Sequence, residues 1–235
     1  MMKIMIILIA TLFFHVSNVC AQKADSLSNG TYHFKCRQLI LPSILVGSGV
    51  LGLTSDWVEY QNHEMRDELT ENIDTKITID DFSQYAPFVS VYGLNLCGAK
   101  GEHSLRDYTA ILATSSLLMG ITVNVLKMAV SEQRPDGTSY NSFPSGHTAT
   151  AFMGAELLRH EYRNVSPWIG VAGYAVAAGT GFFRMYNDRH WFTDVIAGAG
   201  IGILSAKASY WLFPYIGRKV FGKRHSRAAA AIQDY

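Results

Sequence analysis

The sequence predicts an all-α fold: a bundle of about six helices, most of them transmembrane. Hydrophobic residues make up 49% of the 235 positions, and several uncharged stretches are long enough to cross a membrane. The sequence lacks the short alternating runs, separated by turn signals, that would indicate strands. The uncharged stretches are 39–55, 82–99, 108–126 and 164–183, and two more, 148–158 and 195–217, contain one charged residue each.

The first part of the chain, residues 1–21, is typical of an export signal. Lys3 precedes an apolar run over 4–14, and Val19 and Ala21 suit signal peptidase, so we expect cleavage after Ala21. A retained signal anchor is the main alternative. Cys20 would suit lipid attachment, but residues 17–19 lack the residues expected before a lipidated cysteine.

The second part, residues 22–83, predicts an N-terminal helix followed by an acidic segment. Pro42 and three glycines in 39–55 leave two possibilities for this helix: a full span, or a partly inserted or peripheral helix. Residues 56–81 carry nine carboxylates, spaced as in an amphipathic helix. We expect this acidic segment to be a solvated surface element without a catalytic role.

The third part, residues 84–217, predicts the helical core, and residues 218–235 form a basic tail. Gly and Ala dominate parts of this core, as in helices that pack closely in lipid. Glu156 is costly in lipid, so we expect it to face the bundle interior and to pair with a polar neighbour. The glycine-rich stretches are 170–181 and 197–203, and the second, Gly198-x-Gly200-x-Gly202, is no dinucleotide loop because no strand precedes it.

Charge and cysteine content limit the function classes. A formal net charge of +1 implies no bulk attraction to nucleic acid, and no feature indicates an obligate protein partner. Cys36 and Cys97 each lie at the edge of an apolar segment. We favour buried free thiols over a disulfide between them, although an oxidising compartment would permit one.

Three clusters in the second half of the chain carry residues suited to phosphate chemistry. Lys and Arg can bind a phosphate and stabilise the charge that develops as its ester bond breaks. Of two histidines, one can attack phosphorus while the other protonates the leaving oxygen. An Asp four residues after a His can orient its imidazole. The clusters are Lys127 with Arg134-Pro135, Pro144-Ser145-Gly146-His147, and Arg184 with His190 and Asp194.

This set resembles the signature of the type 2 phosphatidic acid phosphatase family, which includes bacterial non-specific acid phosphatases and vanadium haloperoxidases. The resemblance covers roughly residues 84–215. It departs from the family pattern at Phe183, where the third motif usually has Ser before Arg184. The family needs no metal, no cofactor is expected, and the sequence has no spacing typical of a zinc or two-metal site.

The resemblance assigns a role to each matching residue. His190 would be the nucleophile that forms a phosphohistidine, Asp194 its partner, and His147 the general acid. The expected phosphate ligands are Lys127, Arg134, Ser145, Gly146 and Arg184. Further candidates for shaping substrate entry or contacting the leaving group are Asp136, Tyr140, Asn141, Asp188 and Arg189, for which loop roles are at least as plausible.

The charge distribution predicts an orientation. The loops at 100–106 and 159–163 and the tail are basic, and the positive-inside rule places them in the cytoplasm. The three clusters lie at the opposite helix ends, which would place the active site and the acidic segment at the periplasmic face of a bacterial inner membrane. A cleaved leader and a spanning 39–55 cannot both satisfy this orientation.

These features predict a membrane phosphatase acting on an envelope lipid. Candidate substrates are phosphatidic acid or phosphatidylglycerophosphate, undecaprenyl diphosphate, and the phosphates of lipid A. The alternative is a periplasmic non-specific acid phosphatase for soluble monoesters, which the low mean hydropathy favours and the uncharged stretches oppose. A vanadate-dependent haloperoxidase and a non-catalytic role are weaker hypotheses.

Overall fold

The structure, a computed structural model, describes residues 37–71 and 76–221. The expected leader, Cys36 and most of the basic tail lie outside these residues. The chain divides into two compact units, residues 41–210 and a smaller unit of residues 1–40 and 211–235. In the smaller unit the described residues are the first four of α2 and the last part of α9. The larger unit holds all three clusters.

Every regular element in 37–71 and 76–221 is a helix, which confirms the predicted fold class. In chain order they are α2 (Arg37–Leu51), α3 (Asp56–Thr70), α4 (Asp80–Ser83), α5 (Ala86–Leu96), α6 (Leu105–Ala129), α7 (Gly146–Tyr162), α8 (Pro167–Tyr186) and α9 (Phe192–Phe221).

Two of these helices are long and apolar enough to cross a membrane: α6, and α9 over Phe192–Ile216. The pair α2 and α3 would add a third span if counted together, but the two helices are bent by 93° at their junction. Since α3 is polar and begins after this bend, the acidic segment does not continue the direction of α2.

The stretch 82–99 differs from its prediction as a possible span. Its main helix, α5, has only 11 residues, which measure about 16 Å, against a hydrocarbon thickness of about 30 Å. Pro87 lies in the first turn, and Gly98, with φ of 93°, follows the C-cap residue Cys97. Cys97 is exposed, so the expectation of a buried thiol at this position is wrong.

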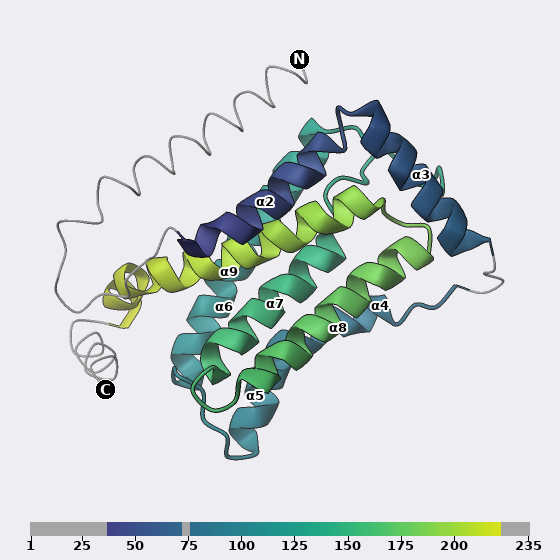
Figure 1. The fold of residues 1–235 in the computed structure, drawn as a ribbon. Coiled ribbons are helices and arrows are strands. Elements are labelled where there is room, and N and C mark those ends of the chain that lie inside the picture. The colour runs from purple at the N-terminus through teal and green to yellow at the C-terminus, as the bar shows by residue number, and fades with distance from the viewer. Residues whose placement is uncertain (1–36, 72–75, 222–235) are drawn as a thin grey trace. The chain divides into compact units, whose positions relative to one another are not determined.

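Helix α7 forms the centre of the larger unit. Figure 1 shows it between α8 and α9, and α5 and α6 also pack against it. Twelve of its 17 residues are buried, among them Met153 and Leu157, which are at most 1% exposed. Because α7 is enclosed by other helices, its first turn is held in a fixed position relative to theirs.

Glycines let α9 approach α7 closely, as the sequence predicts. A Cβ on Gly198 would lie 2.5 Å from the carbonyl oxygen of Ser145, and one on Gly202 would lie 2.2 Å from that of Ala149. Both distances are far below van der Waals contact, so no side chain fits at either position. The glycine run is therefore a helix-packing surface.

Buried ion pairs and hydrogen bonds also tie α7 to its neighbours. Glu156 is 2% exposed and accepts hydrogen bonds of 2.6 Å from Arg159, from Tyr174 of α8 and from Lys207 of α9. This confirms that Glu156 faces the interior and pairs with polar neighbours. A carboxylate removed from water in this way is stabilised only if it keeps such partners.

A second polar cluster lies at the end of α7 remote from His147. Glu161 pairs with His103 Nδ1 at 2.9 Å and accepts a hydrogen bond of 2.6 Å from Tyr210. Candidate ligand atoms of His103, His160 and Glu161 lie within 4.8 Å of one another. The carboxylate of Glu161 already has these two partners, which makes the cluster a structural link between α7, α9 and the loop before α6.

The close approach of α9 to α7 can be tested with Gly202→Ala. Added at this position, a methyl group would displace the backbone of α7, so we expect a loss of about 2 kcal/mol or more of stability, despite the better helix propensity of alanine. This loss of stability can be measured as a decrease in the apparent unfolding temperature in detergent. Gly120→Ala in α6 is the matched control, because a Cβ at Gly120 meets no atom within 4 Å. An unchanged unfolding temperature for Gly202→Ala would contradict this packing.

Candidate active site

Four helix ends bring the sequence clusters together. Lys127 and Arg184 lie in the last turns of α6 and α8, Gly146 begins α7, and Asp194 lies in the first turn of α9. Helix C-termini favour cations, and helix N-termini bind anions through unpaired N–H groups. The site therefore combines side-chain cations with the N-terminus of α7.

His190 and Asp194 form a buried pair at the start of α9. His190 Nδ1 lies 3.4 Å from Asp194 Oδ2, and the two residues are 3% and 0% exposed. The same carboxylate oxygen accepts hydrogen bonds from Ser142 Oγ at 2.5 Å and from the Trp191 N–H at 2.9 Å. These contacts fix the side of the imidazole that carries Nδ1 and leave Nε2 to face a ligand.

Two of the expected phosphate ligands meet around the loop that precedes α7. Lys127 Nζ donates hydrogen bonds to the carbonyl oxygens of Asn141 and Ser142. Arg134 Nε donates to Asn141 Oδ1 at 3.0 Å. The loop thus folds back so that Asn141 connects Lys127 and Arg134, which assigns this residue a loop role.

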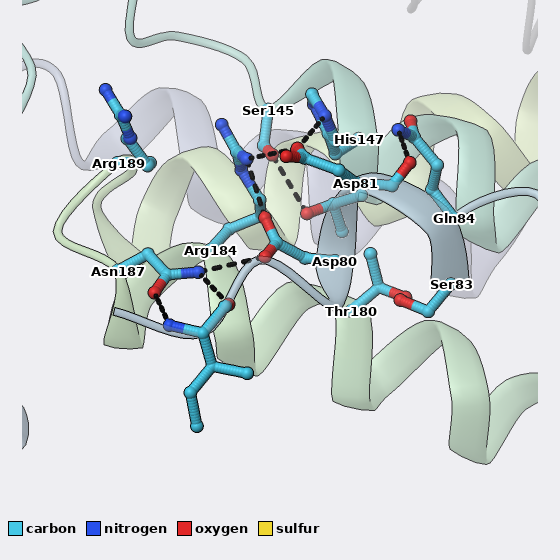
Figure 2. A network of polar contacts seen from close by, with 12 residues as sticks. Asp80, Asp81, Ser83, Gln84, Ser145, His147, Thr180, Arg184, Asn187 and Arg189 are labelled. Carbon is cyan, nitrogen blue, oxygen red and sulfur yellow. Dashed lines mark hydrogen bonds and ion pairs between the residues drawn. The ribbon is translucent and has the colours of Figure 1, made fainter. Parts of the chain in front are cut away.

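Arg184 is the most deeply buried of the expected phosphate ligands with a positive charge. It is 6% exposed, and its Nη1 donates to Asp80 Oδ2 at 2.6 Å. Asp80 Oδ1 accepts a second hydrogen bond, of 2.9 Å, from Asn187, as Figure 2 shows. Within the described residues Arg184 Nε has no hydrogen-bond partner, so this donor remains for an anion.

His147 also has an acidic partner from α4. Its Nε2 lies 3.1 Å from Asp81 Oδ1, and the same oxygen is 3.6 Å from Arg184 Nη1 (Figure 2). The expectation that the whole acidic segment 56–81 is a solvated surface element is therefore wrong for Asp80, whereas the Asp81 side chain is 51% exposed. Asp80 is 1% exposed, because α4 packs against α8, α7 and α5.

Ser145 and Gly146 occupy the expected place but make different contacts. Ser145 Oγ lies 2.9 Å from Thr148 Oγ1, and the Ser145 N–H donates to the carbonyl oxygen of Asp194. Both polar groups of Ser145 are thus engaged within the protein. The first N–H groups of α7, beginning with Gly146, suit an anion better, because helix geometry gives them no partner within the helix.

Three of the further candidates for substrate contact, Asp136, Asp188 and Arg189, form ion pairs near the site. Asp188, at a φ of 60°, accepts two hydrogen bonds from Arg66 of α3, at 2.7 Å and 3.0 Å. Arg189 Nη1 donates to Asp136 Oδ2 at 3.1 Å. Tyr140 is 63% exposed. These two ion pairs brace the loop between α8 and α9.

Phe183, which departs from the family pattern, packs its ring against Phe182 and Tyr186 at centroid distances of 5.7 Å and 5.9 Å. The hydroxyl usual at this position is thus replaced by an aromatic contact on α8. Arg184 keeps its buried place beside this residue.

Electrostatics mark the site as a place for an anion. Burial and the neighbouring Arg184 lower the pKa of Arg134. Burial lowers the pKa of His190 to about 4, against the opposing effect of Asp194. Burial and Arg184 also lower the pKa of His147, while Asp81 and Asp80 act in the opposite direction. A bound anion would relieve the repulsion among these cations.

The arrangement suits nucleophilic attack by a neutral imidazole. With its pKa near 4, His190 is unprotonated at neutral pH, and Nε2 then carries a lone pair. In such an attack Asp194 would stabilise the positive charge that the ring acquires. Arg184, Arg134 and Lys127 have donors of the kind that a phosphoryl group needs.

Sequence reasoning missed three residues of the site: Asp80, Asp81 and Ser142. The carboxylates stood in a segment with many exposed acids, and no short-range pattern distinguished them. Ser142 precedes the second cluster by two residues, and only its hydrogen bond to Asp194, 52 positions away, reveals its place. A single hydroxyl or carboxylate carries no spacing signal of its own.

The fold and the site define a class: helical proteins with two histidines and several cations at one end of a bundle containing membrane-length helices. Residues 108–218 match the family model described as the PAP2 superfamily. This chain belongs to that superfamily.

Two lipid A 1-phosphatases are among the relatives similar to the chain. A lipid A 1-phosphatase of Porphyromonas gingivalis is 39% identical over 196 residues, which are 82% of this chain and 43% of that protein. One from Rhizobium etli is 34% identical over 111 residues, 40% of this chain and 45% of that protein. The chain thus spans less than half the length of these curated relatives.

One solved structure similar to the chain is the crystal structure of Aquifex aeolicus LpxE, with a TM-score of 0.50. It is 24% identical to this chain, and the match covers 63% of this chain and 94% of that one. This likeness concerns the fold.

The lowered pKa of His190 predicts a stability change with pH. An unfolded histidine takes up a proton near pH 6.5, whereas native His190 resists protonation down to about pH 4. The contribution of neutral His190 to the free energy of unfolding is therefore fully present above pH 6.5. It is lost as the pH falls toward 4, by up to about 3 kcal/mol. We expect His190→Gln to lose less stability than wild type between pH 7 and pH 4.5, measured as the unfolding temperature in detergent.

The control for this measurement is Gln61→Ala, because Gln61 is exposed on α3 and does not titrate. This variant should keep the wild-type difference between the two pH values. An equal difference in His190→Gln would show that His190 does not resist protonation in the folded protein.

Proposed function

We propose that this protein is an integral-membrane phosphatase that removes phosphate from an envelope lipid through a phosphohistidine intermediate. The observation that carries the proposal is the buried pair of His190 and Asp194, 3.4 Å apart, surrounded by the cations Lys127, Arg134 and Arg184. A histidine held on one side by a carboxylate has the geometry of an oriented nucleophile.

The proposed reaction has two steps. His190 Nε2 attacks phosphorus, the N–P bond forms as the P–O bond to the lipid breaks, and His147 gives a proton to the departing oxygen. A water molecule then attacks the phosphohistidine and gives a proton to His147, which releases phosphate and restores His190. The three cations hold the phosphoryl oxygens in both steps, so no step requires a metal.

The exposed apolar surface of α6 favours a lipid substrate over a soluble monoester. Leu117, Ile121, Val125 and Met128 are 63%, 55%, 52% and 78% exposed, and α6 ends close to Lys127. Large exposed apolar surfaces indicate contact with membrane or partner. A lipid held against this helix would present its phosphate at the level of the site.

Among envelope lipids, we place lipid A carrying a 1-phosphate first. This choice rests on the two relatives, both of which are lipid A 1-phosphatases. Phosphatidic acid, phosphatidylglycerophosphate and undecaprenyl diphosphate are the other candidates. The site lies at the periplasmic face of the inner membrane in this proposal.

Purified protein can be tested for phosphate release from each of these four lipids and from p-nitrophenyl phosphate, with and without EDTA. We expect the highest kcat/KM with lipid A and no effect of EDTA. Preference for the aryl phosphate over every lipid would favour an acid phosphatase. Bromide oxidation with added vanadate and peroxide would favour a haloperoxidase.

We predict that His190→Ala abolishes turnover while the protein stays folded. The substitution removes the nucleophile itself, so no phosphoenzyme can form. Wild type incubated with a labelled phosphate ester should yield an acid-labile phosphoenzyme that is missing in the variant. Gln61→Ala, at an exposed position of α3, is the control and should retain both activity and labelling. Activity of His190→Ala within tenfold of wild type would exclude the phosphohistidine route.

The orientation makes a separate prediction. A reporter enzyme active only in the periplasm should be active when fused after Tyr140, in the loop before α7, and silent when fused after Tyr235. The reason is the basic residues of 100–106, 159–163 and the tail, which the positive-inside rule keeps in the cytoplasm. The reverse pattern would place the site in the cytoplasm and exclude outer-leaflet lipids as substrates.

A further inference from the structure

The short helix α4 places two adjacent carboxylates at the catalytic residues, and neither belongs to the three clusters. Asp80 contacts Arg184, and Asp81 contacts His147 (Figure 2). They come from a segment more than 60 residues before His147. Since the proposed chemistry assigns them no part, their position requires an explanation.

Asp80 acts as the anchor of this helix. It is 1% exposed, and its two oxygens receive Arg184 Nη1 at 2.6 Å and Asn187 Nδ2 at 2.9 Å. Asn187 also exchanges hydrogen bonds with the main chain of Ile77, at 2.7 Å and 3.0 Å. These bonds fix α4 to the end of α8, so the place of the next residue, Asp81, is also fixed.

Asp81 differs from Asp80 in its exposure and its partner. Its side chain is 51% exposed, and Oδ1 lies 3.1 Å from His147 Nε2. The geometry repeats that of His190 and Asp194 at the other histidine: a carboxylate oxygen faces one nitrogen of the ring. An imidazole held at Nε2 keeps the proton there, and Nδ1 becomes the nitrogen available for transfer.

We propose that Asp81 positions His147 as the general acid, by holding Nε2–H so that Nδ1–H faces the leaving oxygen. The proposal rests on the phosphatase function proposed above. In the first step the proton on Nδ1 passes to the oxygen of the breaking P–O bond. His147 becomes neutral and keeps its Nε2–H on the carboxylate of Asp81. In the second step Nδ1 takes a proton from the attacking water.

The charge of Asp81 also favours the protonated form of His147. Burial, the largest effect, and Arg184 of α8 lower the pKa of His147, whereas Asp81 and Asp80 of α4 act in the opposite direction. Asp80 contacts Arg184 and Asn187. Asp81 contacts His147 at 3.1 Å and Arg184 at 3.6 Å, which makes Asp81 the direct partner of the ring. Removing the charge of Asp81 thus reduces the fraction of His147 that can donate a proton at a given pH.

The role of an acid depends on the leaving group, and this dependence gives a specific test. A lipid alkoxide is a poor leaving group that needs a proton as the bond breaks, whereas p-nitrophenolate is stable without one. Asp81→Asn keeps an oxygen that can accept from Nε2–H but removes the charge. We expect its kcat on phosphatidic acid to fall by about 10- to 100-fold, and its kcat on p-nitrophenyl phosphate by less than about threefold.

The pH profile provides the second readout. With the charge of Asp81 removed, His147 loses its proton at lower pH, so the alkaline limb of kcat/KM on phosphatidic acid should shift to lower pH. Asp81→Glu should restore part of the activity and move the limb back. A purely structural role of Asp81 would move neither the limb nor the ratio between the two substrates.

Asp67→Asn on α3 is the matched control. The Asp67 side chain is 74% exposed and lies 3.9 Å from Arg66, and Asp67 does not line the pocket that contains His190. This variant should match wild type with both substrates. Unfolding temperatures of all variants should agree with wild type, because Asp81 is half exposed.

Each other outcome overturns the proposal. A rise in kcat/KM for Asp81→Asn with both esters would mean that Asp81 competes with the substrate phosphate beside Arg184. Equal losses with both esters and an unshifted pH profile would mean a structural role. Wild-type protein that hydrolyses neither ester, nor the other lipids, would instead refute the phosphatase function on which the proposal depends.

Discussion

The buried ion pair between Arg184 and Asp80 is the interaction on which the site depends most. It joins the end of α8 to α4 with both side chains almost fully buried, at 7% and 1% exposure. Breaking such a pair by removing one partner commonly costs about 3–5 kcal/mol, because the remaining charge stays buried without compensation. The pair also fixes the direction of the guanidinium, whose Nε has no hydrogen-bond partner among the described residues. Stability and anion binding therefore rely on the same contact.

The rest of the bundle supports this contact from a distance. Glycines at the contact of α7 with α9 allow a close approach, and Glu156 and Glu161 connect α7 to its neighbours through buried hydrogen bonds. These contacts lie along the length of α7 and at its far end. They keep the first turn of α7, with His147, at a constant distance from Arg184. Precise placement of catalytic groups requires such rigid support.

The helices and the three clusters could be predicted from the sequence because each leaves a local signal. Apolar length marks α6 and α9, and the internal spacing of each cluster marks the site. The contacts of Asp80 and Asp81 could not be predicted, since they join segments 104 and 66 residues apart. Residues 56–81 contain nine carboxylates, and nothing in the sequence around Asp80 and Asp81 distinguishes these two from the others. The short length of α5 was missed for a different reason: its end depends on a left-handed Gly98, which apolar composition does not reveal.

The right-angle turn between α2 and α3 has a consequence for how such proteins diversify. It brings α3 beside His190, where Met65 and Leu69 line one pocket together with His190 and Trp191. The stretch that matches the superfamily, 108–218, contains the histidines and the three cations, but α3 lies before it. Reaction chemistry and part of the pocket wall thus reside in separate segments of the chain. Exchange of the segment that contains α3 can change which molecule fits the pocket without altering the histidines and cations of the three clusters.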